Sequence, residues 1–292
     1  PLARFMAANN RELVLPYRRF AIGSVYRAEK PQAGRFRQFT QCDFDTVGSN
    51  SLVLDAEIVA INYMVLSRLG FTNEYEIQMN DRRLLDALAR EVGFDRPDTI
   101  MAVFRTWDKL DKISSEEALD YLAGEISTLQ KTKVSTAKNQ LMQLYKPVTD
   151  FLLSLQGHPA SVVLSELARQ FKLPDTQAAL IELAKLDEYV SAYGVPSPRY
   201  KLNPLLARGL SYYTGPIFET VVKTANIGSV TGGGRYDQLI ANMGGPQLPA
   251  TGSSFGLERV MAVMEKLNLR PFSMQSTLVL ASLFDTNDSA TV

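Results

Sequence analysis

The stretch that decides the fold of this 292-residue chain is Tyr26-Arg27-Ala28-Glu29-Lys30-Pro31-Gln32-Ala33-Gly34-Arg35-Phe36-Arg37-Gln38-Phe39-Thr40-Gln41-Cys42-Asp43-Phe44-Asp45. It predicts two strands, at 17–29 and 35–48, joined by a short charged loop that contains a proline and a glycine. Because side chains two positions apart in a strand share a face, one face carries Arg27, Glu29, Arg35, Arg37, Phe39, Gln41, Asp43 and Asp45. We expect the even-numbered side chains of the second strand to form the opposite, mainly core-facing side: Phe36, Gln38, Thr40, Cys42 and Phe44.

The polar face of this hairpin combines arginine, carboxylate, amide and aromatic groups, which suits a site for an anionic nucleotide and a zwitterionic small molecule. The alternative is a hairpin whose charged outer face is simply solvated. Ala21 and Gly23 favour the site, because they lie on the same face as Arg27 and leave space for a ligand. The loop at 30–34 is stiff at its proline end and free at its glycine end, as a lid over a ligand would be.

Composition excludes several classes of protein. Basic and acidic residues balance at 31 each, so any contact with nucleic acid must come from a local patch or from another part of the protein. A single cysteine, Cys42, excludes an internal disulfide and fits a reducing compartment. Neither an apolar run of membrane-spanning length nor a signal peptide is present, so we expect a cytoplasmic protein with no membrane partner. The chain opens inside a helix at 1–10, and we expect further residues ahead of it.

The chain has one histidine, His158, which lies between Gly157 and Pro159 in an expected loop. Nucleophilic mechanisms of the Ser-His-Asp or Cys-His kind need a histidine beside the nucleophile, and a lone loop histidine is usually exposed. Zinc sites built on His/Cys clusters are excluded by the residue count. We therefore expect no metal site on the protein itself.

Further elements follow the hairpin in an irregular alternation of helices and strands. Asp55 is the expected N-cap of a helix that reaches 69, with Gly70 as its stop, and Gly93 ends a second helix. We expect helices at 55–69, 81–92, 174–194, 235–243 and 258–267, and strands at 74–79, 211–222, 227–234, 251–257 and 276–283.

The region from about 98 to 170 is predicted to be an inserted helical subdomain. Apolar residues recur there at spacings of three and four, which predicts a long amphipathic helix with one buried stripe: Val134, Ala137, Leu141, Leu144, Val148, Phe151, Leu152 and Leu155. Pro147 is expected to kink or split this helix. The chain then divides into 1–97, 98–170, 171–270 and 271–292, of which the first and third form one core.

The element order favours an α+β fold with an antiparallel sheet flanked by helices, and not a doubly wound parallel sheet. No Gly-x-Gly-x-x-Gly follows a strand, and no Gly-Lys-Ser/Thr phosphate loop is present. If a nucleotide binds, it must bind without either of the common nucleotide folds.

Four segments of the chain resemble the class II aminoacyl-tRNA synthetases, and in particular the histidyl-tRNA synthetase family. The hairpin is similar to motif 2 of the class, and 207–219 (Ala-Arg-Gly-Leu-Ser-Tyr-Tyr-Thr-Gly-Pro-Ile-Phe-Glu) is similar to the histidine-recognition motif. Residues 232–237 (Gly-Gly-Gly-Arg-Tyr-Asp) and 252–259 (Gly-Ser-Ser-Phe-Gly-Leu-Glu-Arg) resemble the glycine-rich strand and motif 3. The segments keep the family's order and span most of the chain.

This resemblance implies a fold and an activity. The fold is the antiparallel synthetase sheet, with a helical insertion that embraces the acceptor end of tRNA and with the start of an anticodon-binding domain at 271–292. The activity is the formation of histidyl-adenylate from histidine and ATP with Mg²⁺, followed by transfer of histidine to tRNA(His). The family also implies a homodimer, formed through segments that are partly missing from this chain.

The resemblance also implies roles for individual residues. Arg27 and Arg208 contact the α-phosphate from opposite sides, whereas Arg35 and Arg259 contact the β- and γ-phosphates. Glu29 and Phe39 bind adenine. Histidine is bound by the remaining set, in which Gln41 takes the α-amino group and Asp45 an imidazole N–H: Gln41, Asp45, Arg208, Tyr212, Tyr213 and Gly233.

Some of these roles have a plainer alternative. Arg259 could be a surface residue in the first turn of a helix, where a cation is poorly placed unless an anion binds. The tyrosine pair could be strand packing, and the glycine run a bulge or turn. Simple alternation puts Arg208 and Tyr213 on opposite faces, so the chain must bend near Gly209 if both reach a ligand.

The chain departs from the family pattern in two places. Ser211 stands where the family commonly has Asp, and the family's acidic residue and threonine for the α-amino group, together with motif 1, would lie ahead of Pro1. The rival functions are a synthetase-like regulatory subunit of ATP phosphoribosyltransferase and a histidine- or tRNA-sensing module. Both are disfavoured because such paralogues are expected to lose parts of the nucleotide site, which are present here.

Overall fold

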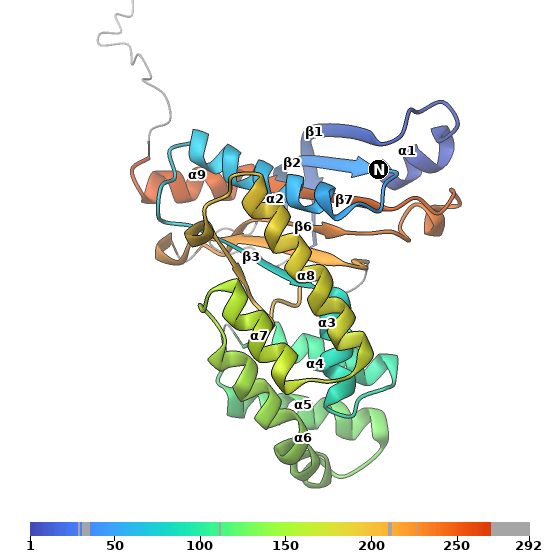
Figure 1. Ribbon diagram of the computed structural model, residues 1–292, viewed down its shortest axis with the longest axis vertical. Helices are drawn as coiled ribbons and strands as arrows, with labels where there is room; N and C mark the ends of the chain where they lie inside the picture. The colour runs from blue at the N-terminus through green and yellow to red at the C-terminus, as the bar shows by residue number, and fades with distance from the viewer. Residues whose placement is uncertain (29, 31–35, 111, 210–211, 226, 270–292) are drawn as a thin grey trace, which may run out of the picture.

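The computed structural model describes residues 1–28, 30, 36–110, 112–209, 212–225 and 227–269. In these ranges the chain forms one twisted sheet flanked by helices (Figure 1), as the sequence predicted. All neighbouring strands are antiparallel except the β3–β4 pair, which is parallel. Their order across the sheet is β1 (Tyr17–Tyr26), β2 (Gln38–Val47), β7 (Ala250–Gly256), β6 (Ser229–Arg235), β5 (Pro216–Val221), β3 (Glu76–Asp81) and β4 (Tyr200–Leu202).

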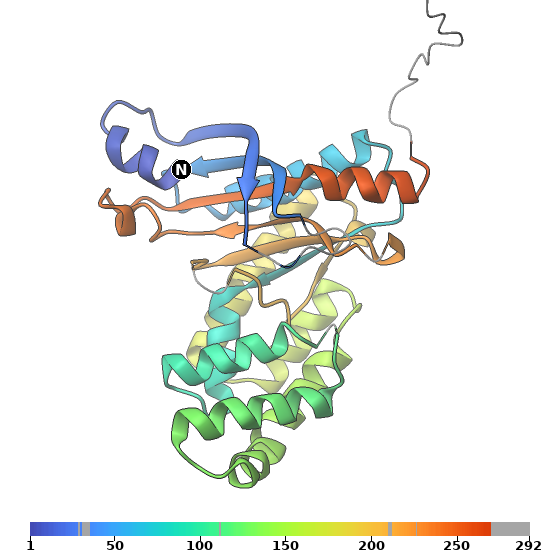
Figure 2. The same ribbon diagram turned by 180° about the vertical axis from the view of Figure 1, so that it is seen from behind.

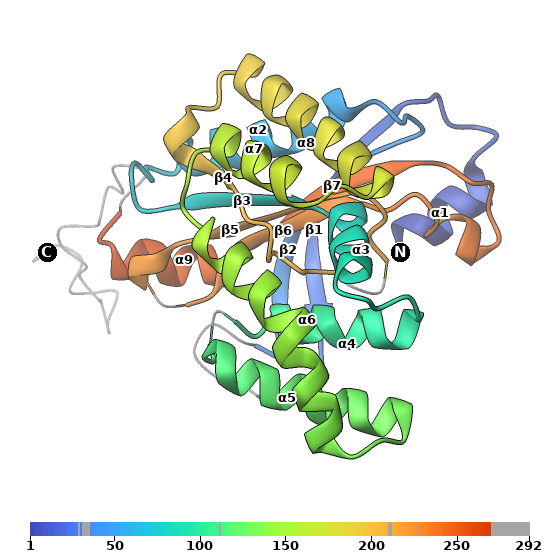
Figure 3. The ribbon, with the colours of Figure 1, turned by 60° about the horizontal axis from the view of Figure 1, so that its bottom comes forward.

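Most of the described helices belong to one of two groups. Helices α2 and α8 pack along one face of the sheet (Figure 3), and Figure 2 brings the opposite face forward, with the β1–β2 hairpin. Helices α4–α7 gather at one end of the molecule (Figure 1). Their bounds are α1 (Leu2–Asn9), α2 (Leu52–Arg68), α3 (Arg82–Glu91), α4 (Pro97–Trp107), α5 (Ser115–Gln130), α6 (Val134–Ser154), α7 (Ala160–Gln170), α8 (Pro174–Ala192) and α9 (Leu257–Lys266).

The domain division at 97 and 170 stays a prediction. The helices of α4–α7 share one continuous apolar cluster with the sheet and α2. The expected strand at 276–283 lies outside the described residues. In the described ranges, no helix combines the length and apolar character that a bilayer crossing requires.

The register of the hairpin produces the two faces that the sequence predicted. Arg19 lies opposite Asp45 and Gly23 opposite Gln41, so odd-numbered side chains of both strands share one face. Cys42 and Phe44 turn to the other side and pack against the core. Phe36 was wrongly assigned to the core side: β2 begins only at Gln38, and Phe36 lies before it, where strand alternation does not apply.

Helix α2 starts earlier than expected, and Asp55 is not its N-cap. Ser51 caps the helix by accepting a hydrogen bond from the backbone N–H of Val53. Asp55 lies one turn further in, fully buried, and its carboxylate binds the guanidinium of Arg235. The end of the helix is as predicted, since Gly70 adopts a positive φ of 88° that favours glycine.

The helix predicted over 235–243 is wrong. Arg235 still belongs to β6, and Tyr236 N–H donates to the carbonyl of Ala250 on β7 at 2.7 Å. The next N–H, of Asp237, donates to the hydroxyl of Thr214. These donors are bound to neighbouring segments of the sheet, so a helix cannot start there, and only the 3₁₀ turn Ala241–Met243 forms. The strand predicted over 211–222 is also shorter, since β5 begins at Pro216.

Of the kink or split expected at Pro147, the split does not occur, because helix α6 is continuous through this residue. The predicted buried stripe is partly wrong, because Val134 and Leu144 are about half exposed, at 52% and 49%. The stripe that is buried instead passes through Tyr145 and Thr149, and the indole N–H of Trp107 donates to the Thr149 hydroxyl at 3.1 Å. The buried residues of α6 are Ala137, Leu141, Tyr145, Thr149 and Leu152, which recur at spacings of three and four.

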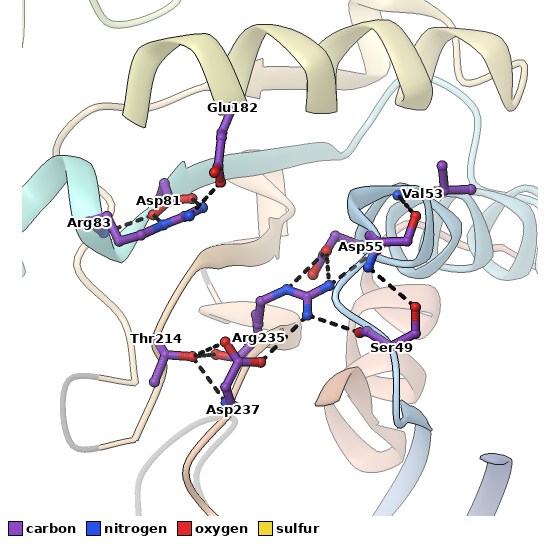
Figure 4. Close-up of polar contacts among 10 residues, drawn as sticks. Ser49, Val53, Asp55, Asp81, Arg83, Glu182, Thr214, Arg235 and Asp237 are labelled. Atoms are coloured by element: carbon purple, nitrogen blue, oxygen red, sulfur yellow. Dashed lines mark hydrogen bonds and ion pairs between the residues drawn. The ribbon is translucent and has the colours of Figure 1, made fainter. Parts of the chain in front are cut away.

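Arg235 links the start of α2 to the end of β6 (Figure 4). Its guanidinium binds Asp55 and donates to the carbonyls of Ser49 and Ser51, both at 3.2 Å. Burial raises the pKa of Asp55, and the charge of Arg235 opposes that rise. The carboxylate of Asp237, which accepts a hydrogen bond from the Thr214 hydroxyl at 3.0 Å, extends the same group of contacts.

Candidate active site

A cavity of about 870 Å³ lies on the face of the sheet opposite the core. Its volume is near the upper end of the range of about 300–1,000 Å³ for ligand pockets. The walls come from α1, from strands β1, β2, β5, β6 and β7, from the start of α9, and from the connection before β5 that carries Arg208 and Tyr213. Nine of the predicted site residues line it: Arg27, Phe39, Gln41, Asp45, Arg208, Tyr212, Tyr213, Gly233 and Arg259. Glu29 and Arg35 lie outside the described residues.

One part of the cavity wall carries Arg27 and Phe39. The guanidinium carbon of Arg27 lies 5.0 Å from the centre of the Phe39 ring, within the range of a cation–π contact. Next to them, both carboxylate oxygens of Glu258 accept a hydrogen bond from the backbone N–H of Thr40, at 2.8 and 2.9 Å. This contact fixes the first turn of α9 on β2, and with it the position of Arg259.

Arg259 reaches the cavity from that first turn of α9. Its Nη1 donates to the backbone carbonyl of Ser229 on β6 at 2.9 Å. A guanidinium carries five N–H donors, and the N-terminus of a helix is itself positive. Both features favour an anion in front of this residue.

Arg208 lies between two carboxylates that the sequence analysis did not assign. Its Nε donates to Glu219 at 2.9 Å and lies 3.4 Å from Asp108 at the end of α4. The carboxylate of Glu219 is only 5% exposed, so it is a firm anchor for the arginine. Glu219 is the last residue of the recognition motif at 207–219, and this position could have identified it from the sequence. Nothing in the sequence indicated Asp108.

The bend predicted after Arg208 is present. Gly209 has a φ of +59°, and its carbonyl accepts from the backbone N–H groups of Tyr212 and Tyr213 at 3.3 and 3.2 Å. A Cβ at this position would lie 1.9 Å from the Tyr213 ring, so only glycine fits. The bend brings Arg208 and Tyr213 to the same cavity, as expected. Ser211 lies outside the described residues.

A buried polar group closes the other part of the cavity. Asp45 lies 2.8 Å from Nη2 of Arg19 and accepts a hydrogen bond from the hydroxyl of Tyr236. Burial raises the pKa of Asp45, and Tyr236 and Arg19 oppose that rise. Burial also raises the pKa values of Tyr213 and Tyr236 well above the ordinary tyrosine value, so both hydroxyls keep their protons.

Sequence reasoning missed two members of this group. Arg19 shares the parity of Asp45 and lies on the predicted polar face, so the alternation could have identified it. Tyr236 could not be found in that way, because it was placed in a helix that does not form.

Gln41 lies between these two parts of the wall. Its side-chain amide donates to Ser254 Oγ at 2.7 Å and to Asp43 Oδ1 at 3.3 Å. Asp43 also lines the cavity, and its charge beside the amide makes this the part of the wall best suited to an ammonium group.

The glycines of β6 and β7 allow the strands and the site to pack closely. A Cβ at Gly233 would lie 2.3 Å from the carbonyl oxygen of Gly252, and a Cβ at Gly252 would lie 2.2 Å from Asp45 Oδ1. Gly232, in contrast, has open space where its Cβ would be. Gly233 is thus required by the neighbouring strand, and Gly232 is the position that gives a ligand room beside the backbone.

In the described ranges, no group of three or more His, Cys, Asp or Glu side chains is arranged to hold a metal ion. His158 is exposed in the connection between α6 and α7 and lines neither the cavity nor its rim.

An antiparallel sheet with this cavity on one face, lined by arginines from three separate segments, defines a class II aminoacyl-tRNA synthetase fold. A family model described as Histidyl-tRNA synthetase matches residues 2–260, and the chain belongs to that family.

Curated relatives and solved structures give the same family. The chain is 37% identical to a histidine–tRNA ligase of Cytophaga hutchinsonii over 98% of its length, and 35% identical to one of Helicobacter hepaticus over 92%. It covers 60% and 58% of those proteins, so it spans about three fifths of their length. The histidyl-tRNA synthetase structure from Nostoc sp. PCC 7120 superposes with a TM-score of 0.77 at 25% identity, over 100% of this chain and 64% of that one.

A second solved structure carries a double description. It is an ATP phosphoribosyltransferase regulatory subunit/histidyl-tRNA synthetase from Bacillus halodurans C, with a TM-score of 0.68 and 25% identity over 90% of this chain and 62% of that chain. The fold alone is therefore compatible with either function.

Proposed function

We propose that this chain is the catalytic core of a histidine–tRNA ligase. The observation that carries the proposal is the convergence of Arg27, Arg208 and Arg259 on one cavity whose other part holds the buried carboxylate of Asp45. The arginines suit a triphosphate, and the carboxylate with its tyrosines suits a polar ring.

In the proposed first step, a carboxylate oxygen of histidine attacks the α-phosphorus of ATP. The new P–O bond forms as the bond to pyrophosphate breaks, and pyrophosphate leaves with that electron pair. Negative charge is spread over the phosphoryl oxygens, so positioning and charge stabilisation do the catalytic work. Arg27 and Arg208 are assigned to the α-phosphate, because a guanidinium pairs with two phosphate oxygens and stays charged.

The remaining nucleotide contacts are assigned by the same chemistry. Arg35 and Arg259 bind the β- and γ-phosphates, Glu29 accepts from the adenine amino group, and Phe39 stacks on the ring. Magnesium enters as part of the substrate, bound to the phosphates of ATP, since Mg²⁺ in such sites is held mainly by substrate phosphates and one or two carboxylates.

The amino acid lies in the other part of the cavity. Gln41 binds its α-amino group, Asp45 accepts from the imidazole N–H, Tyr212 and Tyr213 contact the ring, and the backbone at Gly233 forms the floor. A site built from buried polar groups rejects apolar side chains, because these would leave its donors and acceptors unpaired.

In the second step, the terminal hydroxyl of tRNA(His) attacks the mixed anhydride and AMP leaves. We place the tRNA acceptor end against helices α4–α7. We also propose that the protein is a homodimer and that it works in the cytoplasm.

The regulatory function is the second candidate, because one structural neighbour carries that description. ATP–pyrophosphate exchange by the full-length protein, measured with each of the twenty amino acids, separates the two. We expect exchange with histidine only. Exchange with a different amino acid contradicts the assignment, and histidine binding without any exchange selects the regulatory function.

A further inference from the structure

Arg19 and Asp45 form an ion pair at the buried part of the cavity wall. They are direct neighbours across the β1–β2 ladder, and their side chains are only 19% and 11% exposed. Oδ2 of Asp45 lies 2.8 Å from Nη2 of Arg19, and Oδ1 of Asp45 accepts a hydrogen bond from the Tyr236 hydroxyl. Both residues line the cavity, so a ligand there meets a carboxylate and a guanidinium that already bind each other.

We propose that Arg19 is a specificity-determining residue that makes the site select the uncharged form of the imidazole ring. This inference rests on the proposed function, because it takes histidine as the ligand. A neutral imidazole has one N–H donor and one nitrogen acceptor, which matches a remaining lone pair of the Asp45 carboxylate and an N–H of the Arg19 guanidinium. An imidazolium has two donors and a positive charge, so one of its N–H groups would face the cationic guanidinium without a partner.

The charges around Asp45 support the same conclusion. Asp43, the nearest other carboxylate on β2, contacts Gln41, and Tyr213 and Tyr236 keep their protons. Gly252, opposite Asp45 on β7, has no side chain. With Arg19 the pair is neutral overall, and without it the lone carboxylate of Asp45 would attract a cationic ring.

The test compares histidine with triazolylalanine, an analogue whose ring stays uncharged near neutral pH. Calorimetry on the full-length protein gives the Kd of each ligand at about pH 6 and about pH 8, on either side of the histidine pKa of about 6.5. Dividing the two Kd values at each pH cancels any titration of Asp45 itself. The variants are Arg19→Met, Arg19→Lys and the control Arg18→Met, which breaks an exposed ion pair with Glu57 on the opposite face.

In the wild type we expect the Kd ratio of histidine to analogue to rise about fourfold from pH 8 to pH 6, as the neutral fraction of histidine falls. R18M keeps this rise. R19M loses it and binds histidine about tenfold more weakly at pH 8, since a buried acceptor has lost its partner. R19K, which keeps the charge, restores most of the rise.

Three outcomes overturn the inference. One is a wild-type ratio that does not change with pH, and another is an R19M ratio that rises as in the wild type. The third is an equal loss of both ligands in R19M and R19K with the rise intact, which is a purely structural effect. Failure of the wild type to bind histidine at all is a different result, because it rejects the proposed function itself.

Discussion

Arg208→Gln is expected to lower the kcat of histidine-dependent ATP–pyrophosphate exchange by about a thousandfold, the loss typical of removing one preorganised donor to transition-state charge. Arg208 reaches the cavity through the bend at Gly209, and the nearly buried Glu219 holds its Nε at 2.9 Å. It therefore meets the developing charge without first having to reorganise. The KM for each substrate should change much less than kcat, because the contact strengthens only in the transition state.

A control is needed because Arg208→Gln also leaves the buried carboxylate of Glu219 without its arginine. Removing Arg208 leaves Glu219 without its partner at 5% exposure, which by itself destabilises the fold. The double variant Arg208→Gln/Glu219→Gln should recover stability in a thermal melt while exchange stays low. Recovery of exchange in the double variant would mean that Arg208 serves only to neutralise Glu219. Arg199→Ala, an arginine outside the cavity, should behave as the wild type.

Arg235→Met is expected to lower the free energy of unfolding by about 3–5 kcal/mol, the usual loss when one partner of a buried ion pair is removed. The carboxylate of Asp55 is fully buried and Arg235 is 7% exposed, so the variant leaves an uncompensated charge at the junction of α2 and β6 (Figure 4). This is a large fraction of the stability of a typical domain, about 5–15 kcal/mol. Urea unfolding followed by circular dichroism measures it.

Two control variants test whether the loss comes from the unpaired buried carboxylate. Arg18→Met removes an exposed ion pair with Glu57 and should cost about 0–1 kcal/mol. Arg235→Met/Asp55→Leu replaces both buried charges and should recover most of the loss, because the unpaired carboxylate is gone. A loss in R235M no larger than that in R18M contradicts the role given to this pair.

In the β1–β2 hairpin, most of the cavity-lining side chains could be predicted from the sequence. Strand alternation from Arg27 to Asp45 is a local property of the backbone, so the polar face and its cavity-lining side chains could be predicted without the structure. The same rule covers Arg19, which shares the parity of Asp45 but was not predicted as a site residue. It fails at Phe36, which precedes the strand.

The errors at Asp55 and over 235–243 share one physical cause, which is contact between segments distant in sequence. From its residue type and position, Asp55 was predicted to be an N-cap. In the structure its carboxylate instead binds Arg235, which lies 180 residues away in the sequence. The helix expected at 235–243 is prevented by hydrogen bonds to Ala250 and Thr214. Tyr236 joins Asp45 only because that helix is absent, so local propensity gives no sign of it.

The most direct test of the account is a crystal structure of the full-length protein with ATP and histidinol, which carries an alcohol in place of the reacting carboxylate. We expect Arg27 and Arg208 on opposite sides of the α-phosphate, Arg259 on the γ-phosphate, and the imidazole ring against Asp45. A nucleotide bound outside this cavity, or an imidazole that does not reach Asp45, would contradict the account.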